Sequence, residues 1–157
     1  MRRQLAIAAT AALLLAQPAA AQDPRAGSMA VGHPWTRATV AGAATAAGYL
    51  TLRNEGAEPD RLVSASTPMA RGVEFHETTM TDGVARMRPV AGGILIPPGA
   101  TVRLAPGGLH AMLVGPSGAL ARSTAVPLTL RFERAGEVTV RLAVEAPGAR
   151  AGAHEEH

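Results

Sequence analysis

Apolar and polar residues alternate with a period of two along much of the chain beyond residue 48. The two clearest runs cover residues 126–133 and 138–145, where Val, Leu and Phe alternate with Thr, Arg and Glu. Shorter runs of the same kind cover residues 48–53 and 101–104. This period is typical of β-strands with one buried face and one wet face. The pattern therefore predicts strands, and no stretch after the first 21 residues has a helical period of useful length.

Turn signals separate the predicted strands. Clusters of Gly, Pro, Asn and Asp occur at residues 54–56, 82–83, 92–93, 97–99, 106–108, 115–116 and 135–136. Short strands separated by turns at this frequency predict an all-β protein built as an antiparallel sandwich or barrel. Once the N-terminus is set aside, about 130 residues remain, which is enough for one domain with its own core.

The N-terminus has the three parts of a secretory signal peptide: a basic start, an apolar run over residues 5–15 and small residues at 19–21. We expect a cleaved signal peptide at 1–21, a flexible lead at 22–32, the folded domain at 33–146 and a disordered tail at 147–157. The apolar run is too short to span a bilayer permanently. Because the chain has no cysteine to carry a lipid, we expect a soluble periplasmic protein with no stable membrane insertion.

Charge excludes one class of partner. The 15 basic residues are all Arg and stand against 12 acidic residues. Loss of the predicted signal peptide would leave 13 Arg and a net charge of +1. Nucleic-acid binding predicts a basic patch interleaved with aromatic residues, whereas Arg is scattered here and aromatic residues are few. We therefore expect no nucleic-acid partner.

Two histidines and two methionines lie between residues 76 and 112. Met87 follows His76 after ten residues, and His110 and Met112 form a His-Ala-Met triplet whose two ligands share a strand face. Thioether sulfur is a soft, neutral ligand that suits Cu(I), and imidazole suits copper too. The stretch lacks the clustered carboxylates that calcium requires, and a blue-copper site needs a thiolate. The pattern predicts a Cu(I) site that binds copper and hands it over.

The position of Met87 relative to His76 depends on a predicted hairpin. A four-residue connection at 80–83 would place His76 directly opposite Met87. Opposed residues have Cβ atoms about 5 Å apart, close enough to share one ion. A two-residue Asp82-Gly83 turn is the alternative. We expect that tighter turn to place His76 and Met87 on opposite faces and to abolish the site.

More ordinary interpretations remain open for each residue. A methionine alone is usually a flexible core filler, and a histidine alone is usually a surface or hydrogen-bonded residue. Met80, in the predicted turn, could replace a ligand. His154 and His157 make a short N/O-rich tail suited to Cu(II), although a solvated charged terminus explains them equally well.

Catalysis has no candidate residues. The sequence contains no Ser-His-Asp set, phosphate-binding loop or close carboxylate pair in a plausible context. We therefore expect a protein that is not an enzyme. The alternative to a copper carrier is a metal-free exported β-sandwich that acts as an interaction or assembly module.

Six blocks carry a resemblance to a known family: residues 34–39, 46–54, 60–63, 74–77, 87–90 and 106–113. In these blocks the chain resembles the periplasmic copper chaperones of the PCu(A)C type. Two departures are Glu77, where some members have methionine, and the 22 residues between Met87 and His110, one more than usual.

The resemblance implies a cupredoxin-like Greek-key sandwich, and we expect the protein to be a monomer. It also implies that His76, Met87, His110 and Met112 bind Cu(I). The copper would pass to the binuclear centre of cytochrome c oxidase, through its subunit II or another assembly chaperone. Members often carry a His-rich extension for Cu(II), which His154 and His157 match in reduced form.

Overall fold

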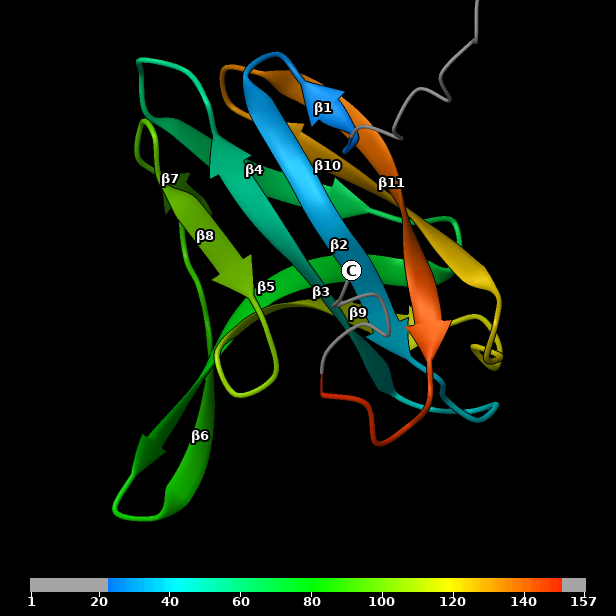
Figure 1. Ribbon diagram of the computed structural model, residues 1–157. Coiled ribbons are helices and arrows are strands. Elements are labelled where there is room, and N and C mark those ends of the chain that lie inside the picture. The colour runs from blue at the N-terminus through cyan, green and yellow to red at the C-terminus, as the bar shows by residue number, and fades with distance from the viewer. Residues whose placement is uncertain (1–22, 151–157) are drawn as a thin grey trace, which may run out of the picture.

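The computed structural model describes residues 23–150, which form strands and connecting turns without any helix (Figure 1). The strands are β1 (Arg25–Ala26), β2 (Met29–Arg37), β3 (Thr45–Asn54), β4 (Asp60–Ser66), β5 (Ala70–Thr81), β6 (Val84–Pro89), β7 (Ile94–Ile96), β8 (Thr101–Leu104), β9 (Leu109–Pro116), β10 (Ala125–Phe132) and β11 (Gly136–Glu145). The all-β prediction is confirmed. Over these residues, the structure contains no helix that could span a membrane.

All strands belong to one sheet with the order β6-β5-β9-β3-β2-β11-β10-β4-β7, and β1 and β8 pair with β2 and β3. The pairing of β11 with β2 is parallel, and the other pairings are antiparallel. Consecutive strands such as β3 and β4, or β9 and β10, are not neighbours, as expected for Greek-key connections. Because β4 also lies against β5, the sheet curls around one core.

The core is built from the alternating strands. The inward residues of β10 and β11 are Val126, Leu128, Leu130, Phe132, Val140, Leu142 and Val144, and all are buried. Full burial of such a side chain stabilises the fold by about 1.5–3 kcal/mol. Their partners on the other face, including Thr129 and Thr139, face outward and share a hydrogen bond of 2.8 Å. The alternation therefore predicted both the strands and the buried face.

At Trp35 and Tyr49, strands β2 and β3 are covered on both faces. Trp35 packs on Tyr49 with 4.7 Å between ring centroids, on the face of β2 and β3 away from the main core. Arg37 lies over both rings, and its Nε donates a 2.7 Å hydrogen bond to the carbonyl oxygen of Ala149. The start of the expected tail, residues 147–150, thus contacts β2.

The start of the domain lies earlier than expected. Residues 22–32 were predicted as a flexible lead, but β1 and the first half of β2 fall within them. Met29, Ala30 and Val31 are buried, and Met29 pairs with Asn54 of β3. The prediction was wrong because β2 is buried on both faces here, so it lacks the alternation that marks a half-exposed strand.

Candidate metal centre

β6 and the part of β5 that pairs with it form an arm, residues 76–89, which projects away from the rest of the curled sheet, here called the barrel (Figure 1). Its connection is the two-residue turn Asp82-Gly83, with Thr81 paired to Val84. Both turn residues have positive φ, 51° and 76°. This is the geometry of a type I′ turn, which matches the right-handed twist of the strands.

The hairpin register differs from the predicted one. His76 lies opposite Pro89, and Met87 lies opposite Thr78, so His76 and Met87 are diagonal neighbours rather than a direct pair. The expectation that the tighter turn would separate their faces was also wrong. The register shifts by two residues, and only a shift of an odd number turns a side chain to the other face. Both residues therefore remain on one face of the arm.

The register defines two faces of the arm. We use "inner face" for His76, Thr78, Met80, Ala85, Met87 and Pro89, and "outer face" for Glu77, Thr79, Thr81, Val84, Arg86 and Arg88. The side chains of Thr78 and Met87 line a hollow between the arm and the barrel. The outer face carries charged residues, whereas the six residues of the inner face include no Arg, Asp or Glu.

Strand β9 supplies the other two predicted ligands. His110 follows a turn with Gly107 at φ 83°, and it lies near the start of the strand as expected. β9 pairs with β5 so that His110 lies directly opposite His76, and Met112 lies opposite Glu74. The two imidazole rings face each other with 6.0 Å between centroids and 26° between planes. The two histidines are therefore adjacent across the sheet.

Hydrogen bonds leave one nitrogen of each ring without a proton. The Nε2 of His76 lies 2.9 Å from the Glu74 carboxylate, and the Nδ1 of His110 lies 3.1 Å from the Gly108 carbonyl oxygen. Both oxygens can only accept, so these ring nitrogens carry the protons in the neutral histidines. The Nδ1 of His76 is buried and has no hydrogen-bond partner among residues 23–150. An unpaired buried nitrogen of this kind needs an explanation, and a bound ion would provide one.

The hollow between arm and barrel has a volume of about 430 Å³. Met87, His110 and Met112 line it together, with Thr78 of the arm and Tyr49 of β3. His76 is not among the lining residues, but its ring lies beside that of His110. The His110 side chain is buried, whereas Met87 is 52% exposed. The four predicted residues thus gather at one place that is open on the Met87 side.

The donor set at this place is two imidazoles and two thioethers. Among residues 23–150, no group of three or more His, Asp or Glu side chains is placed to hold a metal ion. Glu74 was not singled out in the sequence. The signal was its position two residues before His76, which puts the carboxylate on the same strand face as the imidazole.

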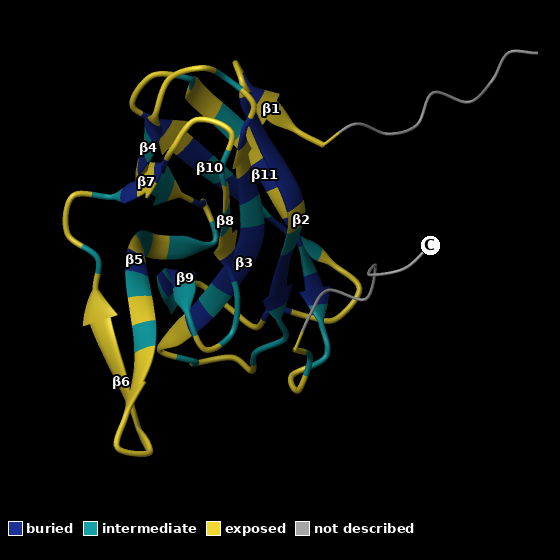
Figure 2. Cartoon of the chain, turned by 60° about the vertical axis from the view of Figure 1, so that its left-hand side comes forward, coloured by how far each residue is buried: buried dark blue, intermediate teal, exposed yellow. Residues whose placement is uncertain are grey.

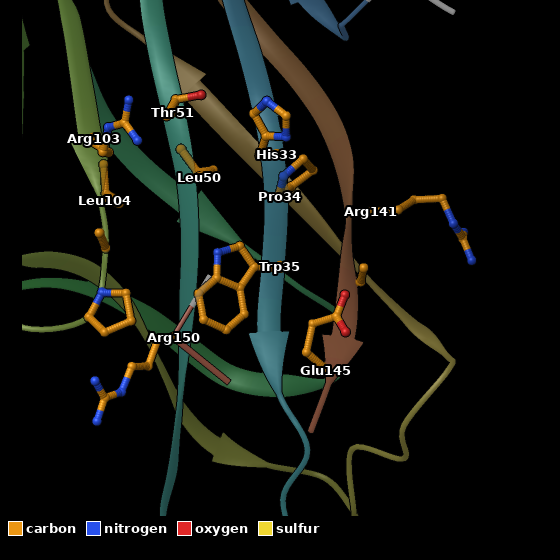
Figure 3. A pocket seen from close by; sticks show the side chains of 13 residues that line it. His33, Pro34, Trp35, Leu50, Thr51, Arg103, Leu104, Arg141, Glu145 and Arg150 are labelled. Atoms are coloured by element: carbon orange, nitrogen blue, oxygen red, sulfur yellow. The ribbon is translucent and has the colours of Figure 1, made fainter. Parts of the chain in front are cut away.

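The other sequence candidates lie elsewhere. Met80 is in β5 near the tip of the arm, not in the turn. His154 and His157 fall outside the described residues. A second cavity, of about 290 Å³, is lined by His33, Trp35 and Leu104 among others, and none of the four described candidate ligands lines it. Figure 3 shows its labelled side chains on β2, β3, β8 and β11, with Arg150 on the segment that follows β11.

Solved structures of one class share this fold. The chain is similar to the copper-bound PCuAC domain from PmoF2, with 36% identity and a TM-score of 0.66 over 78% of this chain and 97% of that one. It is also similar to the solution structure of CuI-DR1885 from Deinococcus radiodurans, with 29% identity and a TM-score of 0.60 over 86% of this chain and 87% of that one. The predicted cupredoxin-like fold of the PCuAC type is confirmed.

The sequence comparisons then give the family. Residues 29–144 match the family described as "Putative lipoprotein LpqE-like". A relative from Leifsonia xyli subsp. xyli (strain CTCB07), described as "Putative lipoprotein Lxx21020", is 35% identical over 117 residues, which cover 73% of this chain and 69% of the relative. The chain belongs to the LpqE-like family.

Proposed function

We propose that the protein is an extracytoplasmic copper carrier that binds Cu(I) through His76, Met87, His110 and Met112. The observation that supports this most directly is that Met87, His110 and Met112 line one hollow, while the His76 ring lies beside that of His110 and has a buried nitrogen without a hydrogen-bond partner among residues 23–150. The similarity to PCuAC domains solved with copper supports the same metal. Soft neutral sulfur with imidazole favours Cu(I) over zinc or calcium.

The hydrogen bonds indicate which nitrogens would bind. Glu74 holds the proton on Nε2 of His76, so the unprotonated Nδ1 of this ring is available to bind the metal. The Gly108 carbonyl oxygen holds the proton on Nδ1 of His110, so the unprotonated Nε2 of that ring is available. A carboxylate that orients a metal-binding histidine typically contributes 10–100-fold to affinity. We expect Glu74→Gln to weaken Cu(I) binding by about tenfold. Glu77→Gln, on the outer face of the arm, is the matched control and should leave affinity unchanged.

Copper would be a cargo in this protein. Two ligands come from β9 in the barrel and one comes from the exposed β6, so an incoming partner can reach the ion from the Met87 side. We propose the binuclear copper centre of cytochrome c oxidase, through subunit II or another assembly chaperone, as the destination. Mixing the copper-loaded protein with the copper-free soluble domain of subunit II and separating the two tests this, because transfer would move copper from the carrier to that domain without any change in oxidation state.

The primary test is competition for Cu(I) against a coloured chelator under reducing conditions. Wild type should take up one equivalent with high affinity, and the double variant His110→Ala/Met112→Ala should lose it. Met69→Leu is the matched control, because Met69 packs against the core away from the hollow. Equal and weak uptake by wild type and the double variant would contradict the carrier proposal and favour a metal-free interaction module.

Export and the C-terminal histidines are separate parts of the proposal. The relatives are described as lipoproteins, which supports a location outside the cytoplasm, but these 157 residues contain no cysteine. Fractionation of cells that produce the protein tests its periplasmic location. Deletion of residues 153–157 should remove Cu(II) binding and preserve Cu(I) binding. An unchanged Cu(II) affinity would exclude the tail as the Cu(II) site.

A further inference from the structure

The tip of the arm exposes a thioether that the four-ligand site does not use. Met80 is 67% exposed, next to the Asp82-Gly83 turn, where polar residues are the usual choice. It lies on the inner face, together with His76 and Met87. Figure 2 shows that β6 is exposed along its whole length, so nothing in the described chain covers this end of the arm.

Met87 lies between Met80 and the histidines. Met80 pairs with Ala85, Thr78 pairs with Met87, and His76 pairs with Pro89. Met87 is therefore one diagonal step from Met80 in one direction and one diagonal step from His76 in the other. Diagonal neighbours on one face of a sheet are about 7–8 Å apart, within reach of long side chains. The thioether of Met87 can approach either neighbour.

The surroundings of these two sulfurs favour a soft ion of low charge. The inner face carries no Arg, Asp or Glu, whereas Glu77, Arg86 and Arg88 all lie on the outer face. Apart from Glu74, which is hydrogen-bonded to His76, hard cations therefore find no carboxylate on this face, and Cu(I) finds two thioethers. Two donors hold an ion less tightly than four, which suits a position that an ion occupies briefly.

We propose that Met80 and Met87 form an outer two-thioether position for Cu(I), through which the ion enters and leaves the four-ligand site. The step is a ligand exchange without redox change. The bond from the metal to the Met80 sulfur breaks as a bond to the Nδ1 of His76 forms, while the Met87 sulfur stays bound. This proposal rests on the proposed function, because it assumes that the inner site binds Cu(I).

The first test uses Ag(I) as a redox-inert substitute for Cu(I) and NMR of protein labelled at the methionine methyl groups. The first equivalent should shift the Met87 and Met112 methyl signals. A second equivalent should shift the Met80 signal, and it should move the Met87 signal again because this thioether is shared by the two positions. The signal of Met69, away from the hollow, is the internal control.

The second test is the rate of Cu(I) transfer from the loaded protein to a chelator, followed by stopped flow. Met80→Leu keeps the size and exposure of the side chain but removes the sulfur. We expect transfer about tenfold slower, within the range that variants of one binding surface show, and an unchanged equilibrium affinity for the first equivalent. Met69→Leu should transfer at the wild-type rate.

The outcomes separate the two proposals. If the wild-type protein binds the first equivalent but the Met80 signal does not move, or Met80→Leu transfers copper at the wild-type rate, the outer position is wrong and the inner site stands. If wild type fails to bind the first equivalent, the proposed function itself is wrong.

Discussion

In β10 every second side chain is buried in the core, whereas every residue of β6 is exposed (Figure 2). Both strands belong to the same sheet, and each pairs antiparallel with its own neighbours. The difference is that β10 is paired on both sides, by β11 and β4, while β6 pairs with β5 alone at the edge of the sheet. Two-stranded hairpins are only marginally stable in water. The barrel therefore provides the stability of the protein, and the arm provides a segment that can open locally.

The candidate site takes residues from both regions. His110 and Met112 come from β9, which is paired on both sides, by β5 and β3. Met87 comes from the arm, and His76 lies where the arm leaves the barrel. One half of the site is thus held in place by the fold, and the other half can adjust. That division suits a carrier, which must hold an ion in transit and release it to a partner.

The largest expected effect separates the two regions by stability. Phe132 in β10 is buried, and Phe132→Ala should lower the free energy of unfolding by about 3–5 kcal/mol because it leaves a cavity in the core. Val84, in the arm, is 53% exposed, and Val84→Ala should change it by less than about 0.5 kcal/mol. Urea unfolding followed by circular dichroism measures both. Similar losses for the two variants would show that the arm is part of the cooperative core.

The second effect separates the two halves of the site. His110→Ala should weaken Cu(I) binding by about a hundredfold, near 2.8 kcal/mol, because a buried ligand on a fixed strand is lost. Met87→Leu should weaken binding by only about tenfold, because the ligand on the arm is exposed and exchanges with solvent. Chelator competition measures both affinities. A larger loss for Met87→Leu than for His110→Ala would reverse the assignment of the firm and adjustable halves.

The third effect concerns the turn that sets the register of the arm. Gly83 has φ 76°, and a left-handed backbone costs other residues about 1–2 kcal/mol. Gly83→Val should therefore lower the free energy of local opening of the arm by that amount. Hydrogen exchange of the arm amides should accelerate, while urea unfolding of the barrel stays unchanged, because local opening does not require global unfolding. Gly118→Val, at a loop glycine without positive φ and with open space around it, is the control. Unchanged exchange in the arm would contradict the type I′ turn.

The difference between half-exposed strands and strands buried on both faces explains which parts of the fold the sequence predicted. The strands with one wet face, β10 and β11, were predicted because alternation records a half-buried strand. The start of β2 was missed because Met29, Ala30 and Val31 are all buried. For such a strand the pattern depends on what covers its second face, and that is a property of the tertiary fold.

For the site, the sequence indicated the four residues but not the register that relates them. Two turns were compatible with residues 80–83, and the positive φ of Asp82 selected the tighter one. His76 and His110 are 34 positions apart in the sequence, so no local pattern could predict that they pair. Whether the four residues bind copper stays a prediction.

The smallest expected effect concerns a cluster of ion pairs in the barrel, around Glu55. The described ion pairs of the arm form no such cluster. Glu55 accepts hydrogen bonds from Arg25 and Arg53, and these contacts, with Arg25 first, hold the pKa of the Glu55 carboxyl below its ordinary value. A carboxylate whose pKa is lower in the folded state stabilises the fold above its unfolded pKa of about 4.3. That contribution is lost as pH falls through the folded pKa.

Glu55→Gln should therefore destabilise the protein slightly at pH 7, because exposed ion pairs contribute little. The difference from wild type should shrink as the pH falls below the ordinary range of glutamate, where the wild-type carboxyl is protonated too. Urea unfolding at a series of pH values measures this convergence, and a difference that persists at low pH would assign the effect to packing rather than charge. At each pH, Glu55→Gln should have the same Cu(I) affinity as wild type, because Glu55 lies outside the hollow that holds the candidate ligands. A change in affinity would mean that the barrel and the arm are coupled more tightly than the exposed hairpin suggests.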